Sequence, residues 1–495
     1  MQRLSGVDSM FLYMETPTNH MHVTGVFLLD PATAPGGFSF PQVHAMVARR
    51  LNRAVQFRRR VVEVPFRLAH PVWIEDPDFD LDYHVRRACL PSPGGRTEFE
   101  DFVGQIVALP LDRQRPLWEM YVVEGLEGGH QAIVVKMHHA AIDGVSGAEL
   151  SATWLDLEAD PPPQVDEDDW QPERVPNEID LLVAAWAQLV SSPIKAVTAV
   201  RRLVETALHL SEHNRDSGVP PPPSPFSAPR TSFNLAITPH RRVAFGEVSL
   251  DDLKAVKNQF QCTVNDVVLA LCAGALRRYL LGRGELPDEP LVGFVPISVR
   301  ADEDGLGAGN RLSAMLTSLA TDVANPIERL RLVSAAMSEA KTQQSLIGAD
   351  VLTNWTEFTF PALIGRAARL ISSMRVFDRL RPAFNVTISN IPGPQFPLFL
   401  AGARVAGMYP LGPVVDGAGL NMTVMSYCGT VYFGFNGCRE TVPDISALPE
   451  MVVDSLDELL AVVRPRRRAG AGTRASGPTR RTRRPAQPGG DVSRQ

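Results

Sequence analysis

The chain has 495 residues, of which 44% are hydrophobic and 21% charged, so a mostly disordered protein is excluded. At about 150 residues per domain, this length allows two or three domains with their own cores. The five cysteines are few, odd in number and lack metal-ligand spacing, which predicts reduced thiols in a cytosolic protein. The opening residues lack a basic segment followed by an apolar run, so we expect no secretion signal.

The charge is divided unevenly along the chain. Residues 464–495 contain ten arginines and one aspartate, a net +9, which leaves −15 for the rest of a chain whose formal total is −6. This Pro- and Gly-rich end predicts a disordered tail, either simply solvated or attracted to anionic lipid. A nucleic-acid role would depend on the tail alone and conflicts with the acidic body, so we expect no nucleic-acid partner.

Both halves of the chain mix strands and helices. In the first half, the hydrophobic pattern predicts strands at 22–30, 120–126 and 131–139 and helices at 40–55 and 97–111. In the second half it predicts helices at 265–284 and 327–344 and strands at 291–299, 384–393 and 430–437. Long apolar helices beside mixed strands indicate an α/β (α+β layered) fold.

The middle of the chain is a connector. Residues 160–176 and 218–229 are Pro-rich, and proline lacks the amide donor that helices and sheets need. Between them, residues 177–213 have helical apolar spacing that Pro193 should break or kink. We therefore divide the chain into an N-terminal domain (1–158), a linker (159–229), a C-terminal domain (230–463) and a tail (464–495). Two similar halves would place a ligand cleft between them.

No uncharged helix-like stretch reaches the roughly 20 residues that a membrane span needs. The longest such stretch, residues 181–194, is too short and contains a proline. We therefore expect no membrane-spanning helix.

The strongest chemical signal is the sequence KMHHAAIDG that ends the strand predicted at 131–139. Strand alternation places His139 on the same apolar face as Met137, whereas His138 lies on the opposite face. A single histidine on such a face is commonly structural, but Asp143 and Gly144 follow closely and permit a tight turn before a helix. Because no serine nucleophile motif or metal-ligating helix accompanies it, the pattern favours general-base chemistry.

HHAAIDG matches the HHxxxDG signature of the acyl-CoA-dependent acyltransferase superfamily, which includes peptide-synthetase condensation domains and plant acyltransferases. Other segments narrow the resemblance: LSGVDSMFLYMETPTNHMHV (4–23), PLW (116–118), ND (265–266), PISVR (296–300) and NVTISNIPGP (385–394). With these, the chain resembles the bacterial wax ester synthase/diacylglycerol acyltransferase family over residues 4 to about 463.

The resemblance implies two chloramphenicol-acetyltransferase-like domains with an active-site tunnel at their interface. It implies transfer of a long-chain acyl group from acyl-CoA, a co-substrate, to diacylglycerol, with wax ester synthesis from a fatty alcohol as a second activity. His139 would act as general base without an acyl-enzyme, and no cofactor or metal is implied. Since the acceptor is a lipid, we expect a cytoplasmic protein bound peripherally to the inner face of the plasma membrane or to lipid bodies.

The resemblance also gives roles to the residues around His139. His138 would support the site, and Asp143, beside Gly144, would be structural rather than a triad partner. An arginine would pair with Asp143; we nominate Arg300, with Arg3 and Arg115 as competitors.

In the second half, Asn265 opens a predicted helix, where it would be an N-cap or a contact to the site. Ser389 and Asn390 end a strand before a forced turn and would line the tunnel. Trp118 is expected to pack rather than react.

Three alternatives remain open from the sequence. The acceptor could be a polyketide or glycolipid hydroxyl, and a condensation domain is disfavoured because no carrier module accompanies it. A non-catalytic lipid-binding protein would not need the intact His139, Asp143 and Gly144. For docking on lipid, the sequence offers the apolar helix around residues 181–190, with Trp186, and the arginine-rich tail. The same apolar pattern is equally consistent with a helix that packs on the domain core.

Overall fold

The computed structural model describes residues 1–142, 153–161, 170, 172–177, 179–181, 222–298, 312–347 and 361–463. The first part of the chain forms the strands β1 (Gln2–Arg3), β2 (His22–Asp30), β3 (Arg59–Val62), β4 (Val72–Glu75), β5 (Val85–Cys89), β6 (Trp118–Glu124) and β7 (Gln131–His138). Its helices are α1 (Gly6–Met14), α2 (Phe40–Arg50), α3 (Leu81–His84) and α4 (Arg96–Ala108).

The second part of the chain repeats this mixture. Its strands are β8 (Arg241–Ser249), β9 (Val292–Ser298), β10 (Leu312–Ser318), β11 (Val386–Ile391), β12 (Phe399–Leu400), β13 (Ala403–Leu411), β14 (Leu420–Tyr427) and β15 (Thr430–Cys438). Its helices are α7 (Leu250–Phe260), α8 (Val264–Gly282), α9 (Pro326–Ile347), α11 (Pro361–Ser373) and α12 (Leu448–Val463). These elements confirm the strands and helices predicted in both halves and the α/β fold class.

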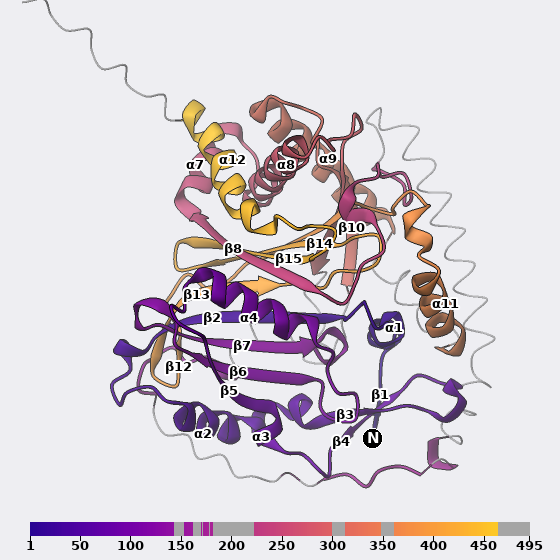
Figure 1. Cartoon of the computed structure of the whole chain (residues 1–495), viewed down its shortest axis with the longest axis vertical. Helices are drawn as coiled ribbons and strands as arrows, with labels where there is room; N and C mark the ends of the chain where they lie inside the picture. The colour runs from indigo at the N-terminus through magenta and orange to yellow at the C-terminus, as the bar shows by residue number, and fades with distance from the viewer. Residues whose placement is uncertain are drawn as a thin grey trace, which may run out of the picture.

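Two six-stranded sheets organise the described residues (Figure 1). The first sheet has the order β12-β13-β2-β7-β6-β5, and the second has the order β10-β9-β11-β14-β15-β8; β1, β4 and β3 form a smaller third sheet. Helices α7, α8, α9 and α12 bury their apolar side chains against the second sheet. Helix α4 covers β2, β6 and β7 of the first sheet and also contacts β8 of the second.

One pair of strands crosses from the second half of the chain into the first sheet. β13 pairs antiparallel with β2, from Arg404 opposite Asp30 to Leu411 opposite Thr24. The two sheets approach closely where β13 meets β15. A Cβ on Gly434 of β15 would lie only 1.8 Å from the Pro410 carbonyl oxygen of β13, so this contact requires a glycine. This exchange joins the halves, so any site between the sheets has walls from both.

The N-cap of helix α8 lies two residues before the predicted N-cap. Thr263 is the N-cap: its hydroxyl accepts from the Asp266 N–H at 3.1 Å, and the Asp266 carboxylate accepts from the Thr263 N–H at 2.9 Å. The predicted N-cap role of Asn265 is therefore wrong, because this reciprocal capping box already satisfies the helix start. Asn265 is the second residue of the helix.

Most of the predicted linker and the whole arginine-rich tail lie outside the described residues. Of the helix predicted at 177–213, the structure describes the beginning, where residues 179–181 are helical. Leu181 is buried against Val64, Val72 and Ile74, so this end of the linker packs on the third sheet.

The described helices all differ from a membrane span in length or composition. None has by itself the length and apolar composition to cross a membrane. By length and composition alone, α7 and α8 pass that test as a pair, with a bend of 103° between them.

Candidate active site

His139 follows directly on the last residue of β7 and begins a short 3-10 turn, His139–Ile142. Its backbone N–H donates to the Met21 carbonyl at 2.7 Å, so the turn is fixed to the chain just before β2. Its imidazole stacks on Phe11 of α1, with ring centroids 4.0 Å apart and planes 22° from parallel. Strand, turn and stacking together give the ring one orientation.

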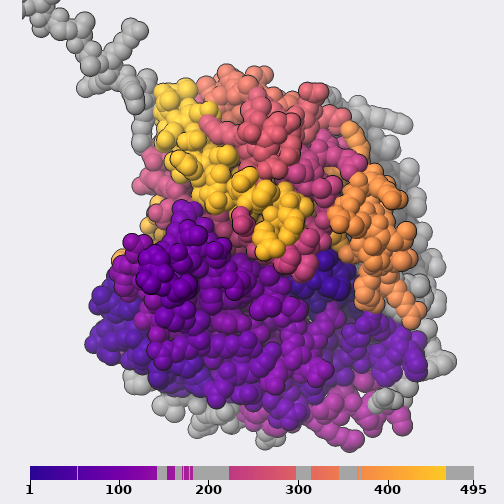
Figure 2. All heavy atoms as spheres, viewed as in Figure 1, coloured from indigo at the N-terminus to yellow at the C-terminus, as the bar shows by residue number. Residues whose placement is uncertain are grey.

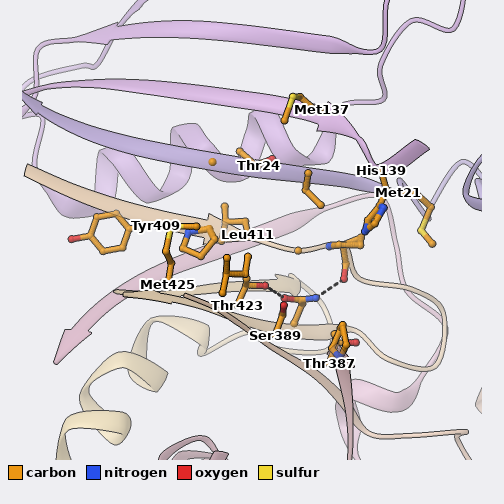
Figure 3. A pocket seen from close by; sticks show the side chains of 18 of the residues that line it. Met21, Thr24, Met137, His139, Thr387, Ser389, Tyr409, Leu411, Thr423 and Met425 are labelled. Atoms are coloured by element: carbon orange, nitrogen blue, oxygen red, sulfur yellow. Dashed lines mark hydrogen bonds between the residues drawn. The ribbon is translucent and has the colours of Figure 1, made fainter. Parts of the chain in front are cut away.

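The His139 ring borders a cavity of about 500 Å³ between the two sheets. Figure 3 shows Met137 and His139 on one side of the cavity and Ser389, Thr423 and Met425 on the other. Ser389 and Thr423 are register partners on the parallel strands β11 and β14. The cavity is therefore a mostly apolar space with a few hydroxyl groups opposite a histidine, as expected for a bound acyl chain with a reacting polar end.

The environment of His139 keeps its ring neutral. Burial, together with the neighbouring His138, lowers the pKa of His139 to about 4, and an interaction with the residue's own backbone opposes this shift. Nδ1 is buried without a hydrogen-bond partner of regular geometry. Because Nδ1 is enclosed, Nε2 is the nitrogen able to meet a substrate, and at neutral pH the ring is free to accept a proton.

His138 points to the other side of β7, as strand alternation predicts. Its Nε2 lies 3.1 Å from a carboxylate oxygen of Glu15, and its Nδ1 accepts the N–H of Ala140 at 3.0 Å. His138 thus connects Glu15 to the backbone immediately after His139. This geometry agrees with a supporting position for His138.

Glu15 is an important neighbour of the site that no sequence motif indicates. It follows α1, and its carboxylate also lies 3.5 Å from Nε2 of His22 and accepts from Nε of Arg113 at 3.0 Å. Burial opposes its ionisation, but hydrogen bonds from His138 and His22 and the charge of Arg113 outweigh burial and hold the pKa of Glu15 well below its usual range.

A sequence signal for this position exists. Phe11, Met14 and Glu15 stand three and four residues apart, which places them on one face of a helix. Phe11 and Met14 line the cavity, and Glu15 continues that face toward His138. The helical spacing could have indicated α1 as a wall of the site.

The other predicted site residues fall into different places. Ser389 lines the cavity. Asn390 instead donates from its side-chain amide to Oδ1 of Asn265 at 3.2 Å, so the structure brings these two residues together, although neither lines the cavity. Trp118 is buried, and its indole N–H donates to the Phe57 carbonyl at 2.7 Å, as expected for a packing residue.

Asp143, Gly144 and Arg300 lie outside the described residues, so their predicted pairing stays a prediction. Of the competing arginines, Arg115 has its Nε 3.6 Å from Asp112. Within the ranges that the structure describes, no group of three or more His, Cys, Asp or Glu side chains could hold a metal ion.

The profile of the wax ester synthase/diacylglycerol acyltransferase catalytic domain matches residues 4–268, and that of the family's C-terminal domain matches residues 308–460. The chain belongs to this family of acyltransferases. The matched regions include His139, the strand β7 before it and strands of both sheets around the cavity, whereas β9 lies between the two regions.

Individual relatives agree over nearly the whole length. A Mycobacterium tuberculosis (strain CDC 1551) protein with the provisional name diacylglycerol O-acyltransferase is 39% identical over 464 residues, which cover 93% of this chain and 90% of the relative. The tgs2 protein of the same strain, also provisionally named a diacylglycerol O-acyltransferase, is 36% identical over 91% of this chain and 97% of its own.

Solved structures confirm the fold. The wax ester synthase/diacylglycerol acyltransferase from Marinobacter aquaeolei VT8 superposes with a TM-score of 0.66 at 31% identity, over 94% of this chain and 100% of that chain. A cyclization-docking bidomain of a Sorangium cellulosum peptide synthetase has a TM-score of 0.52 at 15% identity, over 94% of this chain and 85% of that chain, a likeness of fold alone. The fold class implied by the HHxxxDG resemblance is therefore confirmed.

Proposed function

We propose that this acyltransferase moves a long-chain acyl group from acyl-CoA to the free hydroxyl of diacylglycerol, with His139 as general base. The observation that carries this proposal is the position of His139, a neutral imidazole at a strand end in the wall of an apolar cavity between the sheets. Family membership and relatives named for diacylglycerol acylation support the same acceptor.

The chemistry needs one proton acceptor. Nε2 of His139 takes the proton of the acceptor hydroxyl as the oxygen attacks the thioester carbonyl carbon. The tetrahedral intermediate then expels CoA thiolate, which receives the proton back from the imidazolium, so the products are triacylglycerol and CoA. General-base assistance of this kind contributes about 10²–10⁴-fold. A histidine that is neutral at rest is in the correct protonation state for the first step.

The cavity lining supports an extended lipid substrate. Its walls carry methionine, phenylalanine and valine side chains from both sheets, which suit an acyl chain better than a polar acceptor. A fatty alcohol presents the same combination of an apolar chain and one hydroxyl. We therefore include wax ester synthesis as a second activity of the same site, with no cofactor in either reaction.

The same substrates place the enzyme at a lipid surface. Diacylglycerol remains in membranes and lipid bodies, so a peripheral position on such a surface, on its cytoplasmic side, follows from the proposed acceptor. The two docking segments expected from the sequence, residues 181–190 and the arginine-rich tail, lie almost wholly outside the described residues.

The test replaces His139 by alanine and measures triacylglycerol formation from palmitoyl-CoA and detergent-dispersed diacylglycerol. We expect turnover to fall by about 100-fold or more, with the melting temperature close to that of the unaltered protein. His44→Ala is the matched control, because His44 lies on α2 and pairs with Asp82 away from the cavity. A loss of less than about tenfold at His139 would show that another group removes the proton.

A further inference from the structure

Helix α11 and a nearby turn carry large apolar side chains into solvent. On α11 and just after it, Leu370, Ile371 and Met374 are 59%, 40% and 63% exposed. They stand one, three and four residues apart, so they share one side of the helix. Beside α11, the 3-10 turn Pro65–Arg67 presents Phe66 at 83% exposure, followed by Leu68 at 44%. We call these five side chains the α11 face.

The turn is built to hold Phe66 outward. Phe66 and Arg67 are consecutive non-glycine residues with positive φ, 58° and 55°. Non-glycine residues rarely adopt this left-handed backbone conformation, because it costs free energy. It persists where the surrounding structure imposes it. An aromatic ring held 83% exposed beside two left-handed residues is therefore available for contact outside this domain.

Positive charge surrounds these apolar side chains. From residue 361 to 382 the chain has five arginines and a single acid, Asp378. Two of these arginines are paired, Arg375 with Asp378 and Arg381 with Glu289. The other three, Arg366, Arg369 and Arg379, are exposed. An exposed apolar strip with cationic flanks matches an anionic interface with an apolar interior.

The α11 face also lies next to the proposed active site. Helix α11 packs beside α1 on the outer side of the molecule (Figure 1), and Phe11 and Met14 of α1 line the cavity. Figure 2 shows the α11 segment, in orange, on the molecular surface above the purple N-terminal region. A lipid bound at this face would be one helix away from the cavity.

We propose that the α11 face docks the enzyme on an anionic lipid surface, the apolar side chains entering the interface and the arginines meeting lipid headgroups. This inference deepens the proposed function, because it names the surface from which a lipid acceptor enters. Other exposed apolar residues, such as Leu281 on α8 and Leu332 on α9, stand singly and do not form such a strip. Such scattered residues are ordinary on protein surfaces.

The experiment measures flotation of the full-length protein with vesicles of phosphatidylglycerol and phosphatidylcholine. The test variant is Phe66→Ser with Leu370→Ser and Met374→Ser. We expect the vesicle-bound fraction to fall at least fivefold. The matched control is Leu281→Ser with Leu332→Ser, on the helices that cover the second sheet, and it should float as the unaltered protein does.

A second pair of variants tests the charge. Arg366→Gln with Arg369→Gln should lower binding to phosphatidylglycerol vesicles, whereas Arg49→Gln on the exposed side of α2 should not. Unchanged flotation of the α11 variants, or an equal loss in the controls, would overturn the proposal. Turnover on detergent-dispersed diacylglycerol measures the acyl transfer independently of vesicle binding, and this turnover should persist in every docking variant. If the unaltered protein showed no such turnover, the proposed function would be refuted instead.

Discussion

Replacing Glu15 by glutamine tests whether the group behind the strand positions the base. Glutamine keeps the shape of the side chain and can still accept from Nε2 of His138, but it removes the negative charge. The change therefore weakens the 3.1 Å contact to His138 and the 3.5 Å contact to His22. It also removes the 3.0 Å hydrogen bond from Arg113, because the amide NH2 that replaces Oε2 cannot accept. It makes no direct change in the cavity wall, since Glu15 is absent from the cavity lining.

The magnitude follows from the bonds that lose their charge. A hydrogen bond to a charged group contributes about 1.5–3 kcal/mol and a neutral one about 0.5–1.5 kcal/mol. The contact to His138 therefore loses about 1 kcal/mol, and the bond from Arg113 loses its whole contribution. Because the Arg113 side chain is 36% exposed, solvent screening reduces the contribution of its hydrogen bond to stability. We expect a total loss of about 2 kcal/mol in the free energy of unfolding. The melting temperature should fall by a few degrees.

Catalysis should suffer more than this stability change suggests. His138 holds the Ala140 N–H, and hence the turn that begins at His139, so a loosened His138 moves the base. A displacement of about 1 Å at a reacting group costs about 100-fold. We expect kcat to fall by about 10–100-fold, with the KM for acyl-CoA nearly unchanged.

The assay compares kcat and KM for palmitoyl-CoA at a temperature well below both melting transitions. Glu63→Gln is the matched control, because Glu63 also lies near Arg113, at 3.5 Å, but its side chain is 45% exposed and remote from His138. A Glu15→Gln enzyme that melts lower but keeps its kcat would show that Glu15 only stabilises the fold. Equal losses in both variants would assign the effect to Arg113 instead of His138.

Three further predictions concern protonation, capping and sheet contact. Burial lowers the pKa of His20 and His139 to about 4 and that of His22 to about 3. Below pH 6.5 the histidines of the unfolded chain bind protons, whereas these buried histidines of the folded chain stay neutral, so the melting temperature should fall between pH 6.5 and 4. In enzyme that is still folded, His139 stays unprotonated, so kcat/KM should not decrease until well below pH 6.5. Thr263→Ala should lower stability by about 1 kcal/mol through loss of the α8 cap, as measured by denaturant unfolding. Gly434→Ala should yield little folded protein, because its Cβ would overlap the Pro410 carbonyl, whereas Gly282→Ala, with open space around it, should not lower the melting temperature.

Local patterns predicted most of the fold. The alternation in 22–30 gave β2 with its observed bounds, and the apolar periodicity in 265–284 located α8. The same alternation placed His139 on the cavity face and His138 on the other face. These features depend on neighbours two to four residues away, and such neighbours are visible in a sequence.

Features that depend on distant partners were not predicted. The pairing of β13 with β2 joins residues separated by about three quarters of the chain, and nothing in the local pattern of either strand selects the other. Glu15 acquires its position only when α1 packs beside the end of β7. The cap of α8 is a different case, because the three-residue spacing of Thr263 and Asp266 is a capping-box pattern that is visible in the sequence. The prediction assigned the cap to the adjacent Asn265 instead.

The two faces of β7 separate charge from the reacting space. Lys136 is fully buried behind the strand, where its ammonium donates to the Ile106 and Leu109 carbonyls and lies 3.1 Å from Glu119. His138 meets Glu15 on that same side, two residues further along. Because successive side chains of a strand alternate, His139 emerges opposite this charged layer, among methionine and valine side chains.

No carboxylate pairs with His139 among the contacts that the structure describes, so burial lowers the pKa of His139 without opposition from a negative charge and leaves the base neutral. The period of the strand thus determines both where the base points and its protonation state.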